Sequence, residues 1–337
     1  MRTNIRQVAA LAGVSRTTVS NVLLGKEGRI SPAKRAEVLR AVEKLGYLPV
    51  RPTLQNRVGE TRVLAIAHHD PLLAKYEFHS QVYAGICEAA LKNDYDVLTV
   101  LRSDPDWAAD RTAVRLLDRR SDGILFLPSE QDNTSTFQAL VEHGIPTVAC
   151  YRRDVPEGIA WVDPDNHAAI QGMVDLLVAK GHRRIAHLTY FVRTQFDFLE
   201  RSRAFVKAID LAKLQQLAGG IIEARTGVKR GVTLDTAKQV LASGATAVVC
   251  ANDDLAMQLW DQFESMGVRV PEDISLTGID NQIQMDRRGL TTMEFSYAKV
   301  GGFAVEALIQ RISGMKASDC CYEVPPQLHV RDSIRAI

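Results

Sequence analysis

Apolar residues recur along this chain in two patterns, and the change between them divides the chain into two parts. Between Val8 and Leu23 they return at the spacing of short helices, and the same spacing resumes between Val38 and Leu45. From Arg62 onward, short apolar runs alternate with longer amphipathic segments. Such runs are typical of buried strands, and the longer segments are typical of helices. We therefore expect a small helical N-terminal part followed by a larger α/β part.

The N-terminal part predicts two short helices around a tight turn, followed by a third helix. Gly13 supplies the positive φ that a sharp turn requires, and Ser15 is a natural N-cap for the helix after it. Ser31 and Pro32 begin the third helix, with Ser as N-cap and Pro at the first helical position. The residues expected to pack between the helices are Val8, Ala9, Leu11, Ala12, Val19, Val22, Leu23, Val38, Val42 and Leu45.

The second of these helices leaves a polar face outside the predicted core. Arg16 with Ser20, and Thr17 with Asn21, form two pairs that lie on one face because their members are one helical turn apart. One Arg and short hydrogen-bonding side chains are the groups that base edges and phosphates accept. The pattern indicates a helix-turn-helix whose second helix reads DNA. A small three-helix core without a DNA role has the same apolar spacing and is the alternative.

The distribution of charge favours the DNA-binding interpretation. Residues 1–58 contain 11 Lys and Arg against 3 Asp and Glu, whereas the rest of the chain contains 30 against 37. A basic segment joined to an acidic body indicates polyanion binding at one end, although a solvated basic helix surface has the same composition. The residues that we expect to contact DNA are Arg6, Arg16, Thr17, Thr18, Ser20, Asn21 and Lys34.

Three motifs of the N-terminal part occur in a familiar order. VAALAGVSRTTVSNVL is followed by SPAKR and then by GYLP. In this order they resemble the N-terminal headpiece of the lactose-repressor (LacI) family. The resemblance implies a DNA-binding headpiece over 1–49 and a hinge linker over 50–61, where the family has a short helix with a Leu that enters the minor groove. Asn56 stands where that Leu is expected, a departure that concerns DNA kinking and not DNA binding itself.

Beyond the linker, strands and helices alternate. Strands are predicted over 62–67, 96–101, 123–128, 146–151, 184–190, 219–225, 247–251 and 274–280. Helices are predicted over 82–95, 110–120, 137–144, 168–181, 199–210, 234–243 and 254–267. Repeated alternation of this kind predicts doubly wound parallel sheets. Because no GxGxxG follows any of these strands, a dinucleotide site has no support.

Segments of this α/β part also resemble the sensor of the LacI family. They include VDPDN, TAVVCANDDLAM and VPEDISLTGID. The resemblance implies an all-α headpiece joined to a periplasmic-binding-protein-like (type I) sensor of two doubly wound parallel-sheet lobes. This effector-binding and dimerisation domain would cover 62–337. Lobe 1 is expected over about 62–161 and 291–320, and lobe 2 over about 162–290 and 321–337, so that the chain crosses between them three times.

Ligands of open parallel sheets bind beyond the carboxyl ends of the strands, here between the two lobes. Asn252 and Asp280 each follow a predicted strand directly, and Arg201 lies on the helix after another strand. Together an Asn, an Asp and an Arg can hold sugar hydroxyls or the polar edge of a base. By the resemblance all three map onto effector-binding positions. Helix capping is the alternative role for Asn252 and Asp280.

Further effector-binding candidates are Asp165, Phe78 and His79. Asp165 lies in VDPDN, where it could also serve only the crossing between the lobes. Phe78 and His79 match first-lobe positions that contact the effector in some family members, and simple packing is their alternative. Tyr190-Phe191 stand where the family commonly has Gly-Gly, so we expect a narrower site or stacking in place of sugar hydrogen bonds.

The sequence thus predicts a transcriptional regulator, expected to act as a repressor. It would bind a pseudo-palindromic double-stranded operator as a homodimer and respond to a small-molecule effector such as a sugar or related metabolite. No nucleophile elbow, HExxH or P-loop is present, and we expect no catalytic residue, cofactor or metal. With neither a leader nor a long apolar run, we expect a cytoplasmic protein with reduced cysteines. A solute-binding protein or a sugar-handling enzyme without a DNA role is the alternative.

Overall fold

The computed structural model consists of two compact units, residues Met1–Gly59 and Glu60–Ile337. The residues that the structure describes are 5–23, 30–45, 61–68, 77–101, 116–117, 120–127, 134–190, 196–224, 231–282 and 288–337. The predicted hinge linker over 50–61 lies almost entirely outside these residues, as does most of the predicted helix over 110–120.

Three helices make up the described part of the first unit: α1 (Ile5–Leu11), α2 (Arg16–Leu23) and α3 (Pro32–Lys44). The predicted turn and caps are confirmed. Gly13 has a φ of +60°, and the Ser15 hydroxyl accepts the Thr18 N–H at 3.1 Å at the start of α2. At the start of α3, the Ser31 hydroxyl accepts the Lys34 N–H at 3.4 Å. These local hydrogen bonds satisfy N–H groups that have no partner within the helix.

The core of this unit is small. Val8, Val19 and Val38, one from each helix, are fully buried against one another and against smaller neighbours. The prediction that Leu11 belongs to this core is wrong, because its side chain is 46% exposed at the end of α1. The helix ends at Leu11, and the next residue, Ala12, is buried as predicted.

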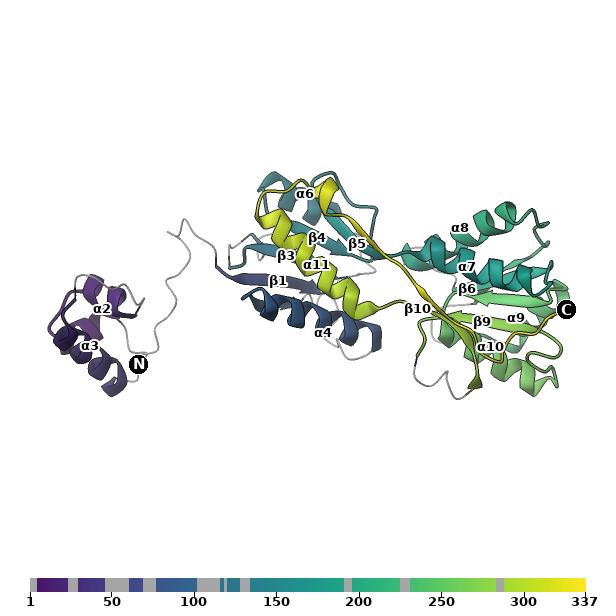
Figure 1. Ribbon diagram of the computed structural model, residues 1–337, viewed down its shortest axis with the longest axis horizontal. Coiled ribbons are helices and arrows are strands. Elements are labelled where there is room, and N and C mark those ends of the chain that lie inside the picture. The colour runs from purple at the N-terminus through teal and green to yellow at the C-terminus, as the bar shows by residue number, and fades with distance from the viewer. Residues whose placement is uncertain are drawn as a thin grey trace. The chain divides into compact units, whose positions relative to one another are not determined.

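A six-stranded sheet forms the first lobe of the second unit, with the order β11-β5-β4-β3-β1-β2 (Figure 1). Its strands, which all run parallel, are β1 (Val63–His68), β2 (Asp96–Leu101), β3 (Gly123–Phe126), β4 (Thr147–Cys150), β5 (Ala160–Pro164) and β11 (Tyr322–Val324). Helices α4 (Glu77–Lys92) and α11 (Tyr297–Ile312) pack on one face, and α6 (Thr134–Glu142) packs on the other.

The second lobe repeats this topology, with the strand order β12-β10-β9-β8-β6-β7. Its strands are β6 (Ile185–Tyr190), β7 (Ile221–Ala224), β8 (Ala247–Cys250), β9 (Ser275–Ile279), β10 (Thr291–Glu294) and β12 (Gln327–His329), of which only β12 runs antiparallel among the described strands. Helices α7 (Asn166–Ala179) and α8 (Phe196–Leu211) cover one face, and α9 (Leu234–Ala242) and α10 (Asp253–Ser265) cover the other. The predicted doubly wound parallel lobes are therefore present.

The chain crosses between the two sheets three times. The crossings join β5 to α7, β10 to α11 and β11 to β12. Each lies a few residues later than the predicted boundary. Strand β10, assigned to lobe 1 from the sequence, pairs with β9 in lobe 2, and β11, assigned to lobe 2, pairs with β5 in lobe 1.

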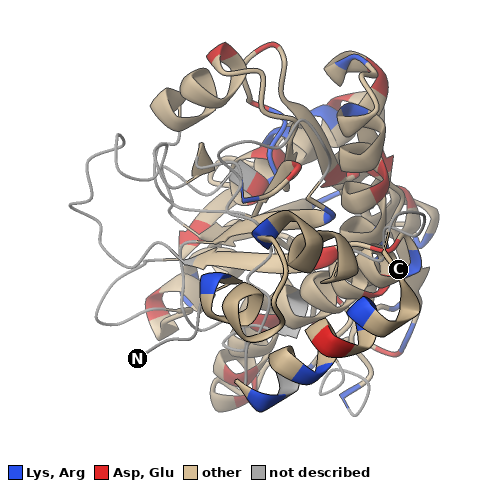
Figure 2. Ribbon diagram, turned by 90° about the vertical axis from the view of Figure 1, so that its left-hand side faces the viewer, with Lys and Arg blue, Asp and Glu red and all other residues tan. Residues whose placement is uncertain are grey.

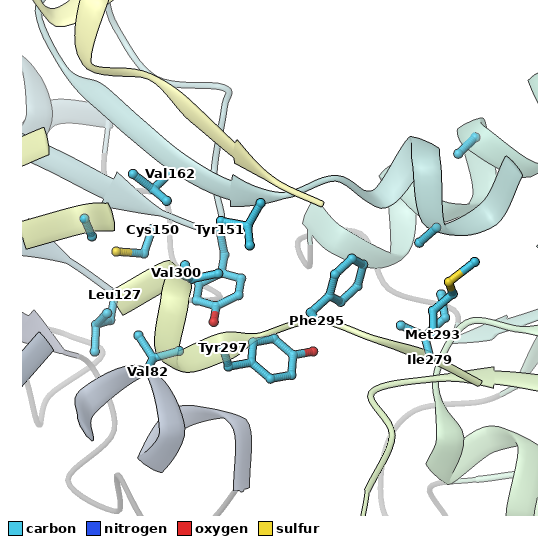
Figure 3. Close-up of a cluster of buried hydrophobic side chains, with 14 of the residues drawn as sticks. Val82, Leu127, Cys150, Tyr151, Val162, Ile279, Met293, Phe295, Tyr297 and Val300 are labelled. Carbon is cyan, nitrogen blue, oxygen red and sulfur yellow. The ribbon is translucent and has the colours of Figure 1, made fainter. Parts of the chain in front are cut away.

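One buried apolar cluster continues from lobe 1 into lobe 2 along these crossings. Val82 and Val162 belong to it in lobe 1, and Ile279 and Met293 belong to it in lobe 2 (Figure 3). In contrast to this apolar cluster, Lys, Arg, Asp and Glu lie mainly on helices and loops (Figure 2). The crossings are therefore packed segments and not free linkers, which restricts how the lobes can move.

The described helices include none that is both long and apolar enough to cross a membrane. All five cysteines are free thiols, as expected, with Cys150, Cys250 and Cys320 buried. Burial raises the pKa of Cys150 to about 12, so this thiol is neutral and packs as an apolar side chain.

Candidate DNA-binding face and effector site

Helix α2 presents the residues expected to contact DNA. Arg16 and Thr17 are exposed, and Ser20 and Asn21 are half-buried, whereas Val19 and Val22 face the core. Thr18 is also half-buried, and its hydroxyl is 2.9 Å from the Ser15 hydroxyl, so part of its hydrogen-bonding capacity serves the helix cap. The helix thus has one apolar side and one polar side, which suits insertion into a DNA major groove.

Arg6 on α1 and Lys34 on α3 are both exposed. They come from the two helices that flank α2 in the sequence, and both side chains are basic. Exposed cations beside a reading helix are suited to phosphate contacts, which orient a protein on DNA without reading its sequence.

Arg201 is the centre of the candidate effector site. It lies on α8 and is almost fully buried, with 5% of its surface exposed. Its Nε donates to Asn166 Oδ1 at 2.8 Å, and its Nη1 donates to the Ala251 carbonyl at 2.6 Å. The guanidinium also lies 5.4 Å from the centre of the Phe295 ring. One side chain therefore connects α7, the end of β8 and the second crossing, all close to the carboxyl ends of the strands.

Asp280 and Tyr297 complete this arrangement. Tyr297, at the start of α11, donates its hydroxyl to Asp280 Oδ1 at 2.5 Å, and Figure 3 shows that hydroxyl extending toward lobe 2. Burial raises the pKa of Asp280 to about 6, although the Arg201 charge and the Tyr297 hydrogen bond oppose the rise. Burial alone would lower the pKa of Arg201, but the negative charges of Asp280 and Asp197 outweigh it and raise that pKa. Predicted residues Arg201 and Asp280 are thus brought together.

Two further carboxylates, not predicted from the sequence, lie in the same surroundings. Asp163 at the end of β5 accepts from Arg153 Nε at 2.6 Å, and burial raises its pKa to about 7, helped by the charge of Asp197. Asp197 hydrogen-bonds Asn166, and burial raises its pKa as well. Asp163 is on lobe 1 and Asp197 on lobe 2, so acidic groups of both lobes interact across the crossing.

Asn252 and Asp165 serve as helix caps in the structure. Asn252 Oδ1 accepts the Leu255 N–H at 2.9 Å and caps α10, while Asp165 Oδ1 accepts the Ala168 N–H at 2.9 Å and caps α7. Capping was the alternative considered for Asn252. In both residues the capping hydrogen bond occupies one side-chain oxygen. The caps do not test an additional contact with an effector, and the effector role of these two residues stays a prediction.

The aromatic candidates have different surroundings. His79 on α4 is buried and makes an edge-to-face contact with His68, with 5.3 Å between ring centres. Phe78 falls within α4, but its side chain lies outside the described residues, as does Phe191. Tyr190 is at the end of β6, where its hydroxyl donates to Asp254 Oδ2 at 2.8 Å and its ring packs edge-on against Phe198.

The sequence reasoning missed Tyr151, Phe295 and Tyr297, which lie together between the lobes (Figure 3). The Tyr297 ring centre is 6.0 Å from that of Tyr151 and 6.1 Å from that of Phe295. Each follows a strand directly or closely, a position that could have singled them out, and Tyr151 has a φ of +60°. In the described residues, no group of three or more His, Cys, Asp or Glu is arranged to hold a metal ion.

Two family models match this chain. Residues 4–50 match "Bacterial regulatory proteins, lacI family", and residues 174–334 match "Periplasmic binding protein-like domain". The first covers the helix-turn-helix, and the second covers most of lobe 2 together with α11 and the C-terminal strands.

Known proteins resemble the chain along nearly its whole length. The HTH-type transcriptional repressor PurR of Vibrio vulnificus is 27% identical over 339 residues, which are 99% of each chain. A solved complex of the transcriptional regulator CelR with cellobiose is 26% identical, with a TM-score of 0.70 over 98% of this chain and 100% of the other. The lac repressor dimer bound to operator and the anti-inducer ONPF has the same fold, with 24% identity and a TM-score of 0.79 over 100% of each chain.

The headpiece match, the two-lobed sensor and the full-length similarity to regulators agree with one another. The relatives named here are transcriptional regulators. Residues 4–50 thus match the LacI family, and the whole chain is similar to transcriptional regulators, with a helix-turn-helix headpiece joined to a periplasmic-binding-protein-like core of two lobes.

Proposed function

We propose that this protein is a dimeric repressor that binds a pseudo-palindromic operator and changes its operator affinity when a small polar effector binds between the sensor lobes. The observation that carries the proposal is the Arg201–Tyr297–Asp280 arrangement. It draws two side chains from lobe 2 and one from the helix that begins at the second crossing. A molecule bound there would sense the relative position of the lobes.

Base reading would be performed by α2. Arg16, Thr17, Ser20 and Asn21 are the proposed reading residues, since they are on its polar side and are short or able to form paired hydrogen bonds. Thr18 would contribute less because its hydroxyl also serves the cap. Arg6 and Lys34 would bind phosphates, so they would contribute affinity for any DNA sequence.

The dimer proposal follows from the size of the reading unit. One short helix reads only a half-site, so useful specificity requires two headpieces related by two-fold symmetry. The structurally similar lac repressor binds its operator as a dimer, which supports this arrangement. We place the dimer interface largely on lobe 1 and the protein in the cytoplasm, where its DNA target would be.

The proposed effector is a sugar or related metabolite. Asp280 would accept hydrogen bonds from its hydroxyls, and Asn252 would contribute the NH2 group that its cap leaves available. Phe78 and His79, from α4, and Asp165 are additional candidates. The CelR complex contains cellobiose, which supports the sugar class. Such an effector changes operator affinity only through its preference for one lobe arrangement, typically by about 1–3 kcal/mol.

Operator binding measured by fluorescence anisotropy tests the proposal. The operator is selected from random duplexes with the full-length protein, and its affinity is then compared with that of a duplex in which one half-site is scrambled. We expect a pseudo-palindromic sequence, a loss of affinity on scrambling, and a further change with one member of a sugar panel that begins with cellobiose and ribose. Selection of no preferred sequence would contradict the regulator proposal and favour a solute-binding protein.

A further inference from the structure

Asp253, at the first position of α10, is fully buried and uses both carboxylate oxygens. Thr292 on β10 donates its hydroxyl to Oδ1 at 2.6 Å, and the backbone N–H of Gln282 donates to Oδ2 at 3.1 Å. The carboxylate therefore joins three segments: the start of α10, the strand that leads to the second crossing, and the turn that follows β9.

The sheet itself makes room for this carboxylate. Thr292 and Gly278 are register partners on adjacent parallel strands. A Cβ atom at Gly278 would lie only 2.2 Å from Asp253 Oδ1 and 3.2 Å from Asp253 Cα. Any residue with a side chain at this position would displace Asp253. The missing side chain thus creates the space in which the carboxylate reaches the Thr292 hydroxyl.

The turn held by Asp253 carries the candidate effector residue Asp280. Asp280 has a φ of +120° and Asn281 a φ of +50°, values that non-glycine residues adopt only when their surroundings enforce them. The Asp280 N–H donates to the Met293 carbonyl at 2.7 Å, the Asn281 N–H donates to the Thr292 hydroxyl at 3.4 Å, and the Gln282 N–H donates to Asp253 Oδ2. The Asn281 side chain also bonds to Glu294 and Arg331. Two unfavourable backbone conformations are therefore fixed between the partner strand on one side and Asp253 on the other.

Asp253 is also the sequence neighbour of Asn252, the second candidate effector residue on lobe 2. Asn252 and Asp253 begin the same helix, so a shift of one moves the other. We propose that Asp253 is a positioning residue of the effector site, which sets the distance between Asn252 and Asp280 without touching the effector. This inference rests on the proposed effector role of those two residues.

A carboxylate suits this position better than an amide. It offers two acceptors to two donors, whereas an Asn has only one oxygen for them. An NH2 group at the Oδ2 position would leave the Gln282 N–H without an acceptor, and an NH2 group at the Oδ1 position would make the Thr292 hydroxyl accept and turn its own proton toward the Met293 carbonyl. Burial raises the pKa of Asp253 to about 7, helped by the charge of Asp280, while the Thr292 and Gln282 hydrogen bonds act in the opposite direction. Protonation would remove one acceptor in the same way as the amide does.

Hydrogen exchange of the full-length protein without ligand tests the geometric part. In Asp253→Asn we expect amides of residues 280–282 to exchange at least about tenfold faster, since the loss of 1.4 kcal/mol corresponds to a factor of ten. Amides of α9 should keep their wild-type rates. Asp261→Asn is the matched control, because Asp261 is on the same helix but is exposed and pairs with Arg288. Unchanged exchange at 280–282 in Asp253→Asn would overturn the inference.

Effector response tests the functional part. The probe is the sugar of the panel above that shifts operator binding of the wild-type protein, starting with cellobiose and ribose. Asp253→Asn should raise the sugar concentration needed for half the shift by about tenfold or more and leave ligand-free operator affinity unchanged. Thr292→Val removes the hydroxyl that Asp253 binds, and the double variant should be no worse than the poorer single variant.

The two possible failures are separable with Asp280→Asn. If Asp280→Asn keeps the wild-type sugar response, the proposed effector site itself is wrong. If Asp280→Asn loses the response but Asp253→Asn keeps it, the site stands and the positioning role of Asp253 is overturned. Strictly additive effects of Asp253→Asn and Thr292→Val would show that the two residues act independently, which also contradicts the inference.

Discussion

The headpiece and the sensor obtain their functional surfaces in opposite ways. In the headpiece, the proposed base-reading residues are neighbours on one helix, and their side chains are exposed or half-buried and contribute little to the core. In the sensor, the candidate site takes Arg201 from α8, Asp280 from the end of β9 and Tyr297 from α11, and these groups bind one another. One surface is local in the sequence, whereas the other exists only after the chain has folded.

This difference predicts different consequences of mutation. A reading residue can be removed at a cost to DNA binding alone, because it supports little of the helix packing. A buried site residue such as Arg201 supports both the fold and the site, so its removal affects stability and ligand response together.

The largest effect is expected from Val19→Asp. Val19 is fully buried among the three headpiece helices, and an unpaired carboxylate there costs more than such a small core provides. The headpiece should unfold and specific operator binding should be lost, while the thermal unfolding of the sensor is unchanged. Leu11→Asp is the control, since Leu11 is 46% exposed and should tolerate the change. Retention of operator binding by Val19→Asp would contradict the assignment of the core.

The next largest effect is expected from Arg201→Ala. This change removes the cation from beside the carboxylates of Asp280 and Asp197 and leaves Asn166 Oδ1 and the Ala251 carbonyl, the acceptors of a buried guanidinium, without their donor. Loss of one partner from such a buried group costs about 3–5 kcal/mol, which urea unfolding of the sensor would measure. Arg203→Ala on the same helix should cost less than about 1 kcal/mol, because Arg203 is exposed. Equal losses in the two variants would show that Arg201 is not a structural centre.

A smaller effect, confined to DNA binding, is expected from Asn21→Ala. If Asn21 makes a good base contact, its loss costs about 1–3 kcal/mol of operator affinity and relaxes the preference at one base pair. The free energy of unfolding should stay within about 0.5 kcal/mol of the wild type. Affinity measurements across single-base operator variants provide the test, and an unchanged preference would show that α2 presents a different face to the DNA.

The smallest effect is expected from Arg6→Ala. Loss of one phosphate contact should weaken binding to operator and to random DNA alike, and it should reduce the slope of log affinity against log salt by about 0.9. Titrations at several salt concentrations would measure both. A loss restricted to the operator would assign Arg6 to base reading instead.

Much of the fold follows from local sequence signals. Ser15 and Ser31 cap the helices that their positions predict, and the strand–helix alternation gives both lobes. Local signals are less informative where packing between distant parts of the chain decides the structure. Leu11 fits the helical apolar spacing, but α1 ends there and its side chain is exposed. The sheet to which β10 or β11 belongs is decided by pairing with β9 or β5, on the far side of a crossing. The periodicity of the residues within each strand carries no information on that pairing.

The candidate effector site divides in the same way. Asp280 could be predicted because it follows a strand directly, and Arg201 could be predicted because it lies on the helix after a strand and matches an effector-binding position of the family. The position of Tyr297 shortly after a strand could have marked it as a candidate, but its contact with Asp280 forms only through the second crossing and could not be predicted. Asn252 shows where prediction from strand ends is ambiguous, because a polar residue there can either cap the next helix or contact a ligand. In the structure Asn252 caps α10.

The most direct test of the whole account is the operator affinity of Asp280→Asn with and without the effector. This variant keeps an oxygen to accept the Tyr297 hydroxyl but removes the charge beside Arg201. Ligand-free operator affinity should match the wild type, and the shift caused by the sugar that acts on the wild-type protein should be lost. A wild-type shift in the variant would contradict the central claim that a ligand held at Asp280 controls DNA binding.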